Sequence, residues 1–358
     1  MVNNVNALDV ASLRAALLGW YDGQARVLAW RVSPSDRRRG VRPDPYRVWV
    51  SEVMLQQTTV AAVVGYFARF MDAFATVQDL ADAPEAEVMR LWAGLGYYSR
   101  ARSLHAAAQV IAAAGGQFPE TEEGWRALPG IGPYTAAAIA AIAFDRPAVV
   151  VDGNVERVIS RLFAVEAPLP VSKPALRSLA GIVFQGERPG DFAQAMMDLG
   201  ATVCAPRSPK CLLCPISRAC AARAQGAPET YPRKLAKEAK PERHGAAFWL
   251  QSEAGVWLVR RPGRGLLGGM AGLPSTPWTG QAVDSVTLAE HAPASGLWQQ
   301  VGVVQHVFTH FSLTLTVQVA HGGAPRGEGW WVPVAGVEAA GLPSVFAKAA
   351  RLAMAAQP

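Results

Sequence analysis

The four cysteines of this 358-residue chain are its most restrictive feature. Cys204, Cys211, Cys214 and Cys220 follow the pattern C-x6-C-x2-C-x5-C. Cysteines confined to one short segment are typical of a metal site in a reducing compartment rather than of a disulfide framework. A structural zinc site usually presents two close pairs separated by a longer loop, whereas this segment has one close pair and two flanking cysteines. The spacing therefore favours an iron–sulfur cluster, with zinc and unligated thiols as the alternatives.

The overall composition narrows the class of protein. The chain is 51% hydrophobic and 17% charged, as expected of a folded globule, and its length favours two domains. Its net charge of +6 indicates a polyanionic partner but no particular chemistry. The polar start, Met1–Val10, does not resemble a secretory signal, and the longest apolar run, Thr135–Phe144, is too short to cross a bilayer. We therefore expect a cytoplasmic protein without a membrane partner, and we expect it to act as a monomer.

Apolar residues at three- and four-residue spacing predict an all-α domain over residues 1–225. The segments with this spacing are Val48–Phe70, Ser103–Ala114, Tyr134–Phe144, Val155–Phe163 and Phe192–Val203.

The composition changes after the cysteines. Residues 226–244 carry several prolines, lysines and arginines, which is typical of an exposed linker. Residues 245–358 contain short strand patterns separated by Gly-rich turns, and they predict a smaller α+β domain. The predicted strands are Ala246–Leu250, Val256–Arg260, Gln299–Phe308 and Leu313–Ala320, followed by a closing helix at Ser344–Ala355.

A Gly-rich turn, Leu128–Thr135, joins two apolar helical segments. Gly130 and Gly132 let the backbone approach a ligand closely, and the helix that follows presents free N–H groups and a positive dipole end. A phosphate fits such a site without any side chain. An ordinary turn between helices is the alternative.

Two carboxylates are candidates for chemistry. Asp152 precedes the predicted helix Val155–Phe163, so it is placed to cap that helix. A carboxylate at a helix N-terminus is held ionised, which also suits it to stabilise a developing cation. Glu52 lies within an apolar helical pattern, so either it points to solvent or burial raises its pKa for chemistry.

Taken together, these stretches resemble the MutY-type adenine DNA glycosylases, a family of the helix-hairpin-helix superfamily that includes endonuclease III. The matching stretches are SEVMLQQT (51–58), WAGLGYY (92–98), the turn at 128–135, VDGN (151–154), QAMMDLG (194–200) and the cysteine loop. They extend from about Trp30 to Cys220. The combination is specific, and it favours a catalytic role for both carboxylates.

The resemblance implies a division of labour among four residues. Glu52, protonated, would donate to N7 of adenine while the N-glycosidic bond breaks. Asp152, ionised, would stabilise the oxocarbenium-like sugar. Tyr134 and Asn154 match positions that support this step. The resemblance also implies that the four cysteines hold a [4Fe-4S] cluster.

Further matching positions imply contacts with double-stranded DNA containing adenine opposite 8-oxoguanine or guanine. The target adenine must leave the base stack to be reached. Trp30, Arg31 and Gln194 match positions that line the adenine pocket. Gln57 and Tyr97 match positions that enter the duplex at the vacated site. The other substrate-binding positions implied in this part of the chain are Leu55, Thr58, Gly130 and Gly132.

The predicted C-terminal domain resembles the Nudix-like module of the same family. The stretch after Leu266–Pro274 has no clustered glutamates to hold magnesium, so the resemblance implies a reader of 8-oxoguanine rather than a hydrolase. Phe308, Thr309 and His310 lie where the family usually has Phe-Ser-His. Thr309 keeps the hydroxyl but adds a methyl group.

Two departures from the family pattern remain. Ala29 stands where the family usually has Pro, and about ten residues around 33–42 are inserted, including Arg37, Arg38 and Arg39. These arginines are expected either to bind phosphate or to form a solvated loop.

Three alternatives remain open. The nearest are an endonuclease III-type enzyme and a thymine-mismatch glycosylase. The first needs a Lys at the position of Tyr134 to form a Schiff base, and the second generally lacks the C-terminal domain. The third is a non-catalytic DNA-binding protein, against which the two carboxylates argue.

Overall fold

The structure is a computed structural model that describes residues 8–235, 239–263 and 265–356. The chain separates into two compact units, one formed by residues 1–83 and 102–236 and the other by residues 84–101 and 237–358. The expectation that the polar start Met1–Val10 is not a secretory signal falls largely on residues 1–7, which lie outside the described part.

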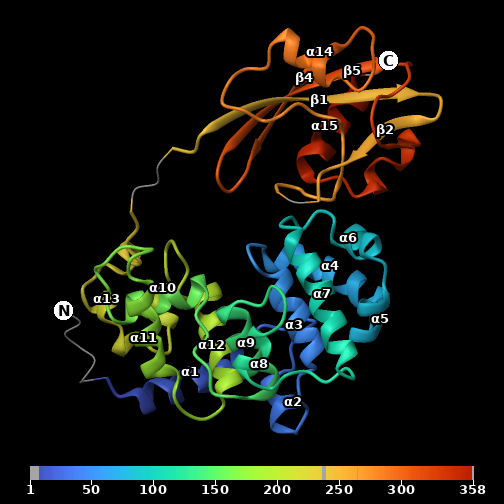
Figure 1. Cartoon of the computed structure of the whole chain (residues 1–358). Helices are drawn as coiled ribbons and strands as arrows, with labels where there is room; N and C mark the ends of the chain where they lie inside the picture. The colour runs from blue at the N-terminus through green and yellow to red at the C-terminus, as the bar shows by residue number, and fades with distance from the viewer. Residues whose placement is uncertain (1–7, 236–238, 264, 357–358) are drawn as a thin grey trace. The chain divides into compact units, whose positions relative to one another are not determined.

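The first unit is helical (Figure 1). Its α-helices are α1 (Val10–Gln24), α2 (Pro34–Arg38), α3 (Pro45–Met54), α4 (Val60–Ala73), α5 (Val77–Asp82), α7 (Ser99–Ala113, whose first turn belongs to the second unit), α8 (Glu122–Arg126), α9 (Pro133–Phe144), α10 (Gly153–Leu162), α11 (Lys173–Phe184), α12 (Pro189–Thr202) and α13 (Ala221–Ala224). Among the described residues, no helix combines the length and apolar character needed to cross a membrane.

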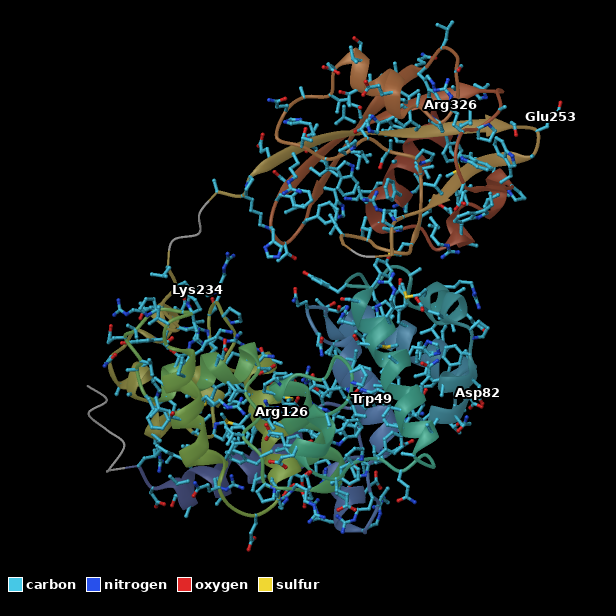
Figure 2. The ribbon with its side chains drawn as sticks, in the orientation of Figure 1. Trp49, Asp82, Arg126, Lys234, Glu253 and Arg326 are labelled. Atoms are coloured by element: carbon cyan, nitrogen blue, oxygen red, sulfur yellow. The ribbon has the colours of Figure 1, made fainter. Side chains whose placement is uncertain are left out.

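Helix α9 is the centre of this unit because it is apolar on every side. Its residues from Thr135 to Ala143 are all buried, and most of them are alanines. Small side chains let neighbouring helices approach closely, and α3, α8 and α12 all pack against α9. Beside it, Trp49 of α3, which is labelled in Figure 2, packs against Trp125 of α8 with ring centroids 5.8 Å apart. Helix α3, which carries Glu52, and helix α9, which follows the Gly-rich turn, therefore share one core.

The predicted helical segment Val48–Phe70 is two helices, α3 and α4. The helical pattern is interrupted at residues 55–59, where Gln57 has a positive φ of 56°. Thr59 then caps α4 by accepting the backbone N–H of Ala62. The apolar spacing runs through this break, so periodicity alone did not reveal it.

The inserted arginines do not form the loop that the sequence indicated. Residues 34–38 form α2, and the Arg37 side chain is only 9% exposed. Its guanidinium lies 3.1 Å from Asp145 and 3.3 Å from Asp191, which belong to the ends of α9 and α12. Arg37 therefore neither faces solvent in a loop nor is free to bind phosphate. Its charge is paired inside the protein, where it links α2 to α9 and α12.

The first half of the predicted linker packs against the helical unit. Tyr231 is 3% exposed, and its carbonyl accepts a hydrogen bond from the buried Arg161. Lys234, which is labelled in Figure 2, forms an isolated parallel β-bridge with Leu169. An exposed linker was expected over residues 226–244, but residues up to about 235 are part of the first unit's structure.

The second unit contains a mixed sheet with the order β3-β2-β1-β5-β4, and β6 also pairs with β2. Strands β1 and β5 are parallel, and the other pairs are antiparallel. Its elements are α6 (Glu85–Trp92), β1 (Glu242–Ser252), β2 (Gly255–Arg260), β3 (Ala271–Gly272), α14 (Ser285–His291), β4 (Gln299–Val307), β5 (Ser312–His321), β6 (Trp330–Val332) and α15 (Ser344–Ala355).

Strand β1 shows how the sheet is covered on both faces. Ala247 and Trp249 belong to a core cluster with the buried residues of α15. Ala246 and Phe248 belong to another cluster, with residues of α14 packed against it. Alternate residues of a strand point to opposite faces, so this uninterrupted apolar run is explained by burial on both sides. The four predicted strands and the closing helix are confirmed.

Candidate active site

Glu52 and Tyr134 form the centre of the site. Glu52 lies in α3, is 6% exposed, and accepts a 2.8 Å hydrogen bond from the Tyr134 hydroxyl at the start of α9. Burial raises the pKa of Glu52 to about 7, although the Tyr134 hydrogen bond and the Arg31 charge oppose this shift. Of the two alternatives for Glu52, the solvent-facing one is therefore wrong, and the buried carboxyl is placed to hold or release a proton near neutral pH.

Asp152 caps α10, as its position in the sequence predicted. Its carboxylate accepts the backbone N–H of Val155 at 2.7 Å and the side-chain N–H of Asn154 at 3.0 Å. Burial nevertheless raises the pKa of Asp152, against these hydrogen bonds and the Arg157 charge, which lower it. The donors fix the carboxylate in place, and the removal of water makes its negative charge more effective on a nearby cation.

The structure brings these residues together from three separate helices. The charge of Asp152 raises the pKa of both Glu52 and Tyr134, so the two carboxyls are near enough for their charges to influence each other. Desolvation is the main reason that the pKa of Tyr134 lies well above its usual range, so its phenol is a hydrogen-bond donor rather than an anion. A buried pair of carboxyls with one pKa near 7 is typical of acid–base chemistry.

The predicted pocket residues belong to the same unit. Trp30 is buried edge-on against Phe67, and Gln194 of α12 is 2% exposed, with its amide donating to the Gly190 carbonyl. Arg31 lies near enough to Glu52 for its charge to lower the pKa of that carboxyl.

Asp198 and Arg26 support this pocket, and the sequence interpretation identified neither of them. Asp198 of α12 is completely buried, and it accepts hydrogen bonds from both Arg26 and Arg31. Asp198 lies within the matching stretch 194–200, one helical turn after Gln194, so its spacing was a signal that could have identified it.

The two predicted wedge residues have unusual backbones. Gln57 and Tyr97 both have a positive φ, 56° and 48°, and both side chains are exposed. Non-glycine residues in this conformation are uncommon and are concentrated at functional sites. Leu55 and Thr58 flank the first of them and are partly buried.

The two glycines of the turn have different structural requirements. Gly130 has a φ of 72°, and a Cβ there would lie 2.2 Å from the Cβ of Ser103. Gly132 caps α9 with a negative φ of −87°, and a Cβ there would meet no atom within 4 Å. The fold therefore requires glycine at position 130 but not at position 132.

The four cysteine thiols are free and line one cavity. Burial raises the pKa of the Cys214 thiol to about 12, and the charges of the other three cysteines add to this shift. Arg161 is buried beside them and donates to the Cys204 sulfur at 3.2 Å and to the carbonyls of residues 204, 205 and 206. This arginine holds the loop in its folded shape.

Within residues 8–235, 239–263 and 265–356, no three His, Cys, Asp or Glu side chains form a group that could hold a metal ion. A cluster differs from a single ion because its irons are separate atoms that each take one thiolate. Four half-buried thiols around a shared cavity are the donor set that such a cluster requires.

In the second unit, Phe308–Phe311 forms the turn between β4 and β5, closed by a 2.8 Å hydrogen bond from the Phe308 N–H to the Phe311 carbonyl. The Phe308 ring packs between Trp278, 5.6 Å away, and Phe311, 4.8 Å away. Thr309 and His310 are exposed at the tip. The turn thus presents two polar side chains on a rigid aromatic base.

Comparisons with known proteins agree with both units. A family model described as "HhH-GPD superfamily base excision DNA repair protein" matches residues 50–177, and one described as "NUDIX domain" matches residues 246–352. The adenine DNA glycosylase of Homo sapiens is 39% identical over 367 residues, which cover 86% of this chain and 67% of that protein. The one from Mus musculus is 39% identical over 389 residues, covering 90% and 74%.

A solved structure resembles the helical part. It is the structure of a thermostable thymine-DNA glycosylase, with a TM-score of 0.52 and 29% sequence identity, and it covers 60% of this chain and 97% of its own.

Proposed function

The chain belongs to the adenine DNA glycosylase family, and we propose that it hydrolyses the N-glycosidic bond of adenine mispaired with 8-oxoguanine or guanine in double-stranded DNA. The observation that carries this proposal is the buried Glu52, whose pKa of about 7 keeps part of the population protonated at neutral pH. The chemistry needs such an acid, because adenine is a poor leaving group until its ring is protonated.

Glu52 acts first in the proposed reaction. Its proton is donated to N7 of an adenine that has left the base stack, and the glycosidic bond then breaks as the base accepts the bonding electrons. The Tyr134 hydroxyl donates a 2.8 Å hydrogen bond to the Glu52 carboxylate, so it orients the carboxyl and stabilises its ionised form after Glu52 has given up its own proton.

Asp152 acts on the sugar. The departing base leaves an oxocarbenium-like ring, and a fixed negative charge lowers its free energy. Asn154 and the Val155 N–H hold this charge in one position, which avoids reorganisation during the reaction. Water then adds to the anomeric carbon and loses a proton to the ionised Glu52, which completes the hydrolysis and restores the acid.

Several residues bind the DNA rather than react with it. Trp30, Arg31 and Gln194 line the pocket for the extruded base. Gln57 and Tyr97, together with Leu55 and Thr58, contact the duplex at the vacated site, and their exposed, positive-φ positions support this role. Gly130 and Gly132 bring the backbone N–H groups of the turn to a phosphate.

The glycine pair gives a direct test of the turn. Gly130→Ala is expected to destabilise the fold by at least about 2 kcal/mol, because of its positive φ and the contact with Ser103. Gly132→Ala is expected to change stability by less than about 0.5 kcal/mol, yet to weaken DNA binding roughly tenfold by displacing the phosphate. Denaturant unfolding and fluorescence anisotropy measure the two effects. Unchanged affinity in Gly132→Ala would show that the turn is only a connection between helices.

We also propose that the four cysteines hold a [4Fe-4S] cluster, which would stabilise the loop that follows α12. The free, half-buried thiols and their shared cavity support this assignment. Such thiols need a bound cation to be held as thiolates.

Purification without oxygen is expected to give brown protein with about four irons per chain. Cys214→Ser is expected to lower the iron content and the visible absorbance, and Leu212→Ala serves as the control, because Leu212 lies in the same loop but is exposed and does not line the cavity. Metal analysis that found one zinc per chain in colourless, active protein would exclude the cluster.

We propose that residues 1–225, together with the packed stretch up to residue 235, form the catalytic domain and that residues 245–358 form a reader of the base opposite adenine. The exposed Thr309 and His310 at the rigid turn, together with Phe308, support the reader role. The absence of clustered glutamates after Pro274 in the sequence argues against hydrolysis by this domain.

One set of duplexes tests the proposed function against its alternatives. Strands that contain adenine opposite 8-oxoguanine, thymine opposite guanine, or thymine glycol are incubated with excess protein. We expect release of adenine only, and abasic strands that break only after alkali treatment, because Tyr134 cannot form a Schiff base. Release of thymine or its glycol, or a covalent adduct trapped with borohydride, would support the other glycosylase classes. Binding without any base release would indicate a non-catalytic DNA-binding protein.

A further inference from the structure

Asp198 is a buried carboxylate that the proposed chemistry does not yet use. It lies in α12 with none of its surface exposed. The Arg31 guanidinium donates to both of its oxygens, at 2.9 and 2.8 Å. Arg26 donates its backbone N–H at 3.0 Å and its side-chain Nε at 2.6 Å. A carboxylate that accepts four such hydrogen bonds is rigidly held.

The two arginines are not equivalent. The Arg26 side chain is 26% exposed, so water screens its charge, whereas the Arg31 side chain is 8% exposed. Arg31 is also the one whose charge reaches Glu52 and lowers the pKa of that carboxyl. Asp198 therefore pairs directly with the arginine whose charge reaches Glu52.

We propose that Asp198 is a positioning residue, which fixes the Arg31 guanidinium within the base-excision site and offsets its positive charge there. This inference rests on the proposed function, because it assigns a role within that reaction. Without Asp198, an uncompensated cation would lie beside the acid, and the proton needed for adenine release would be lost at a lower pH.

The other groups around Glu52 do not replace this effect. Tyr134, from α9, donates to Glu52 and is not ionised. Asp152, from the start of α10, is negative and raises the pKa of Glu52. Tyr21, from α1, experiences the charges of both Arg31 and Asp198, but desolvation raises its pKa above the usual range, so it is neutral. Arg31 is the cation in this set, and the carboxylate that offsets its positive charge is Asp198.

The test is the pH dependence of single-turnover adenine release. In the wild type, the rate constant is expected to fall above about pH 7, where Glu52 loses its proton. Asp198→Asn is expected to move this fall about one pH unit lower, the effect of one uncompensated charge near the acid. Asp198→Glu, which restores the charge, is expected to return it to within a few tenths of a unit of the wild-type position. Arg31→Gln is expected to move it in the opposite direction from Asp198→Asn.

Asp191→Asn is the matched control. Asp191 lies in the same helix, is 4% exposed, and is paired with Arg37 and Arg188 rather than with Arg31. The substitution removes the same charge from a similarly buried ion pair. It is expected to lower thermal stability without moving the pH dependence.

A second measurement does not require activity. Infrared spectra of the wild type minus those of Glu52→Gln isolate the protonated carboxyl band of Glu52, and the pH at which the band disappears is then compared with and without Asp198→Asn. If the band shifts as expected but no duplex releases adenine, the proposed function is wrong and the role of Asp198 stands. An unmoved band in folded Asp198→Asn, or an equal shift in Asp191→Asn, would overturn the inference. If Asp198→Asn does not fold, Arg31→Gln is used instead. The inference is then overturned if the Glu52 band of Arg31→Gln does not disappear at a higher pH than that of the wild type.

Discussion

Replacing Glu52 by Gln is expected to slow single-turnover release of adenine by roughly 10² or more. Gln has the size of Glu and can still accept the hydrogen bond from Tyr134, so the pocket should keep its shape. It has no proton of suitable acidity to give to the base. Affinity for a duplex with adenine opposite 8-oxoguanine, measured by anisotropy, is therefore expected to persist.

The same substitution at Glu156 is the control for this experiment. Glu156 is in α10, its side chain is 16% exposed, and it pairs with Lys173 at 3.1 Å, away from the proposed chemistry. Glu156→Gln is expected to release adenine at nearly the wild-type rate. Near-normal release by Glu52→Gln would contradict the assignment of the acid, whereas equal losses in both variants would indicate a general effect on the helical unit.

The sequence predicted those parts of the site that depend on local pattern. The cysteine spacing and the Gly-rich turn are local features, and so is the capping position of Asp152. The closing helix was predicted at Ser344–Ala355, where the structure has α15. The family resemblance added the roles, which no local pattern supplies.

Features formed by distant residues were not predicted. Asp198 pairs with Arg26 and Arg31, which lie 172 and 167 positions earlier in the chain. The three successive arginines 37–39 are typical of a solvated or phosphate-binding loop. Nothing in the local sequence indicates that Arg37 pairs with Asp145, which lies 108 positions later in the chain. Ion pairs of this kind depend on how the helices are packed, so they become visible only when the fold is known.

Removal of residues 236–358 is expected to reduce the preference for 8-oxoguanine over guanine opposite adenine by roughly tenfold or more. The structure determines where the chain should be cut. Tyr231 is buried in the first unit and the Leu235 N–H donates to the Leu169 carbonyl, so the shortened protein should end at Leu235 rather than earlier. Every proposed catalytic residue lies before this point, so adenine release from both mispairs should remain measurable.

Point variants in the full-length chain show whether the turn itself is the reader. His310→Ala is expected to lose several-fold of the preference, and Thr309→Ala somewhat less, since a buried hydrogen bond to one base contributes about 1–3 kcal/mol. His321→Ala is the matched control, because His321 is also exposed but lies at the opposite end of β5. If the shortened protein lost rate equally on both mispairs, the domain would be a general DNA clamp. If it lost the preference while His310→Ala and Thr309→Ala kept it, another surface of the same domain would be the one that reads the lesion.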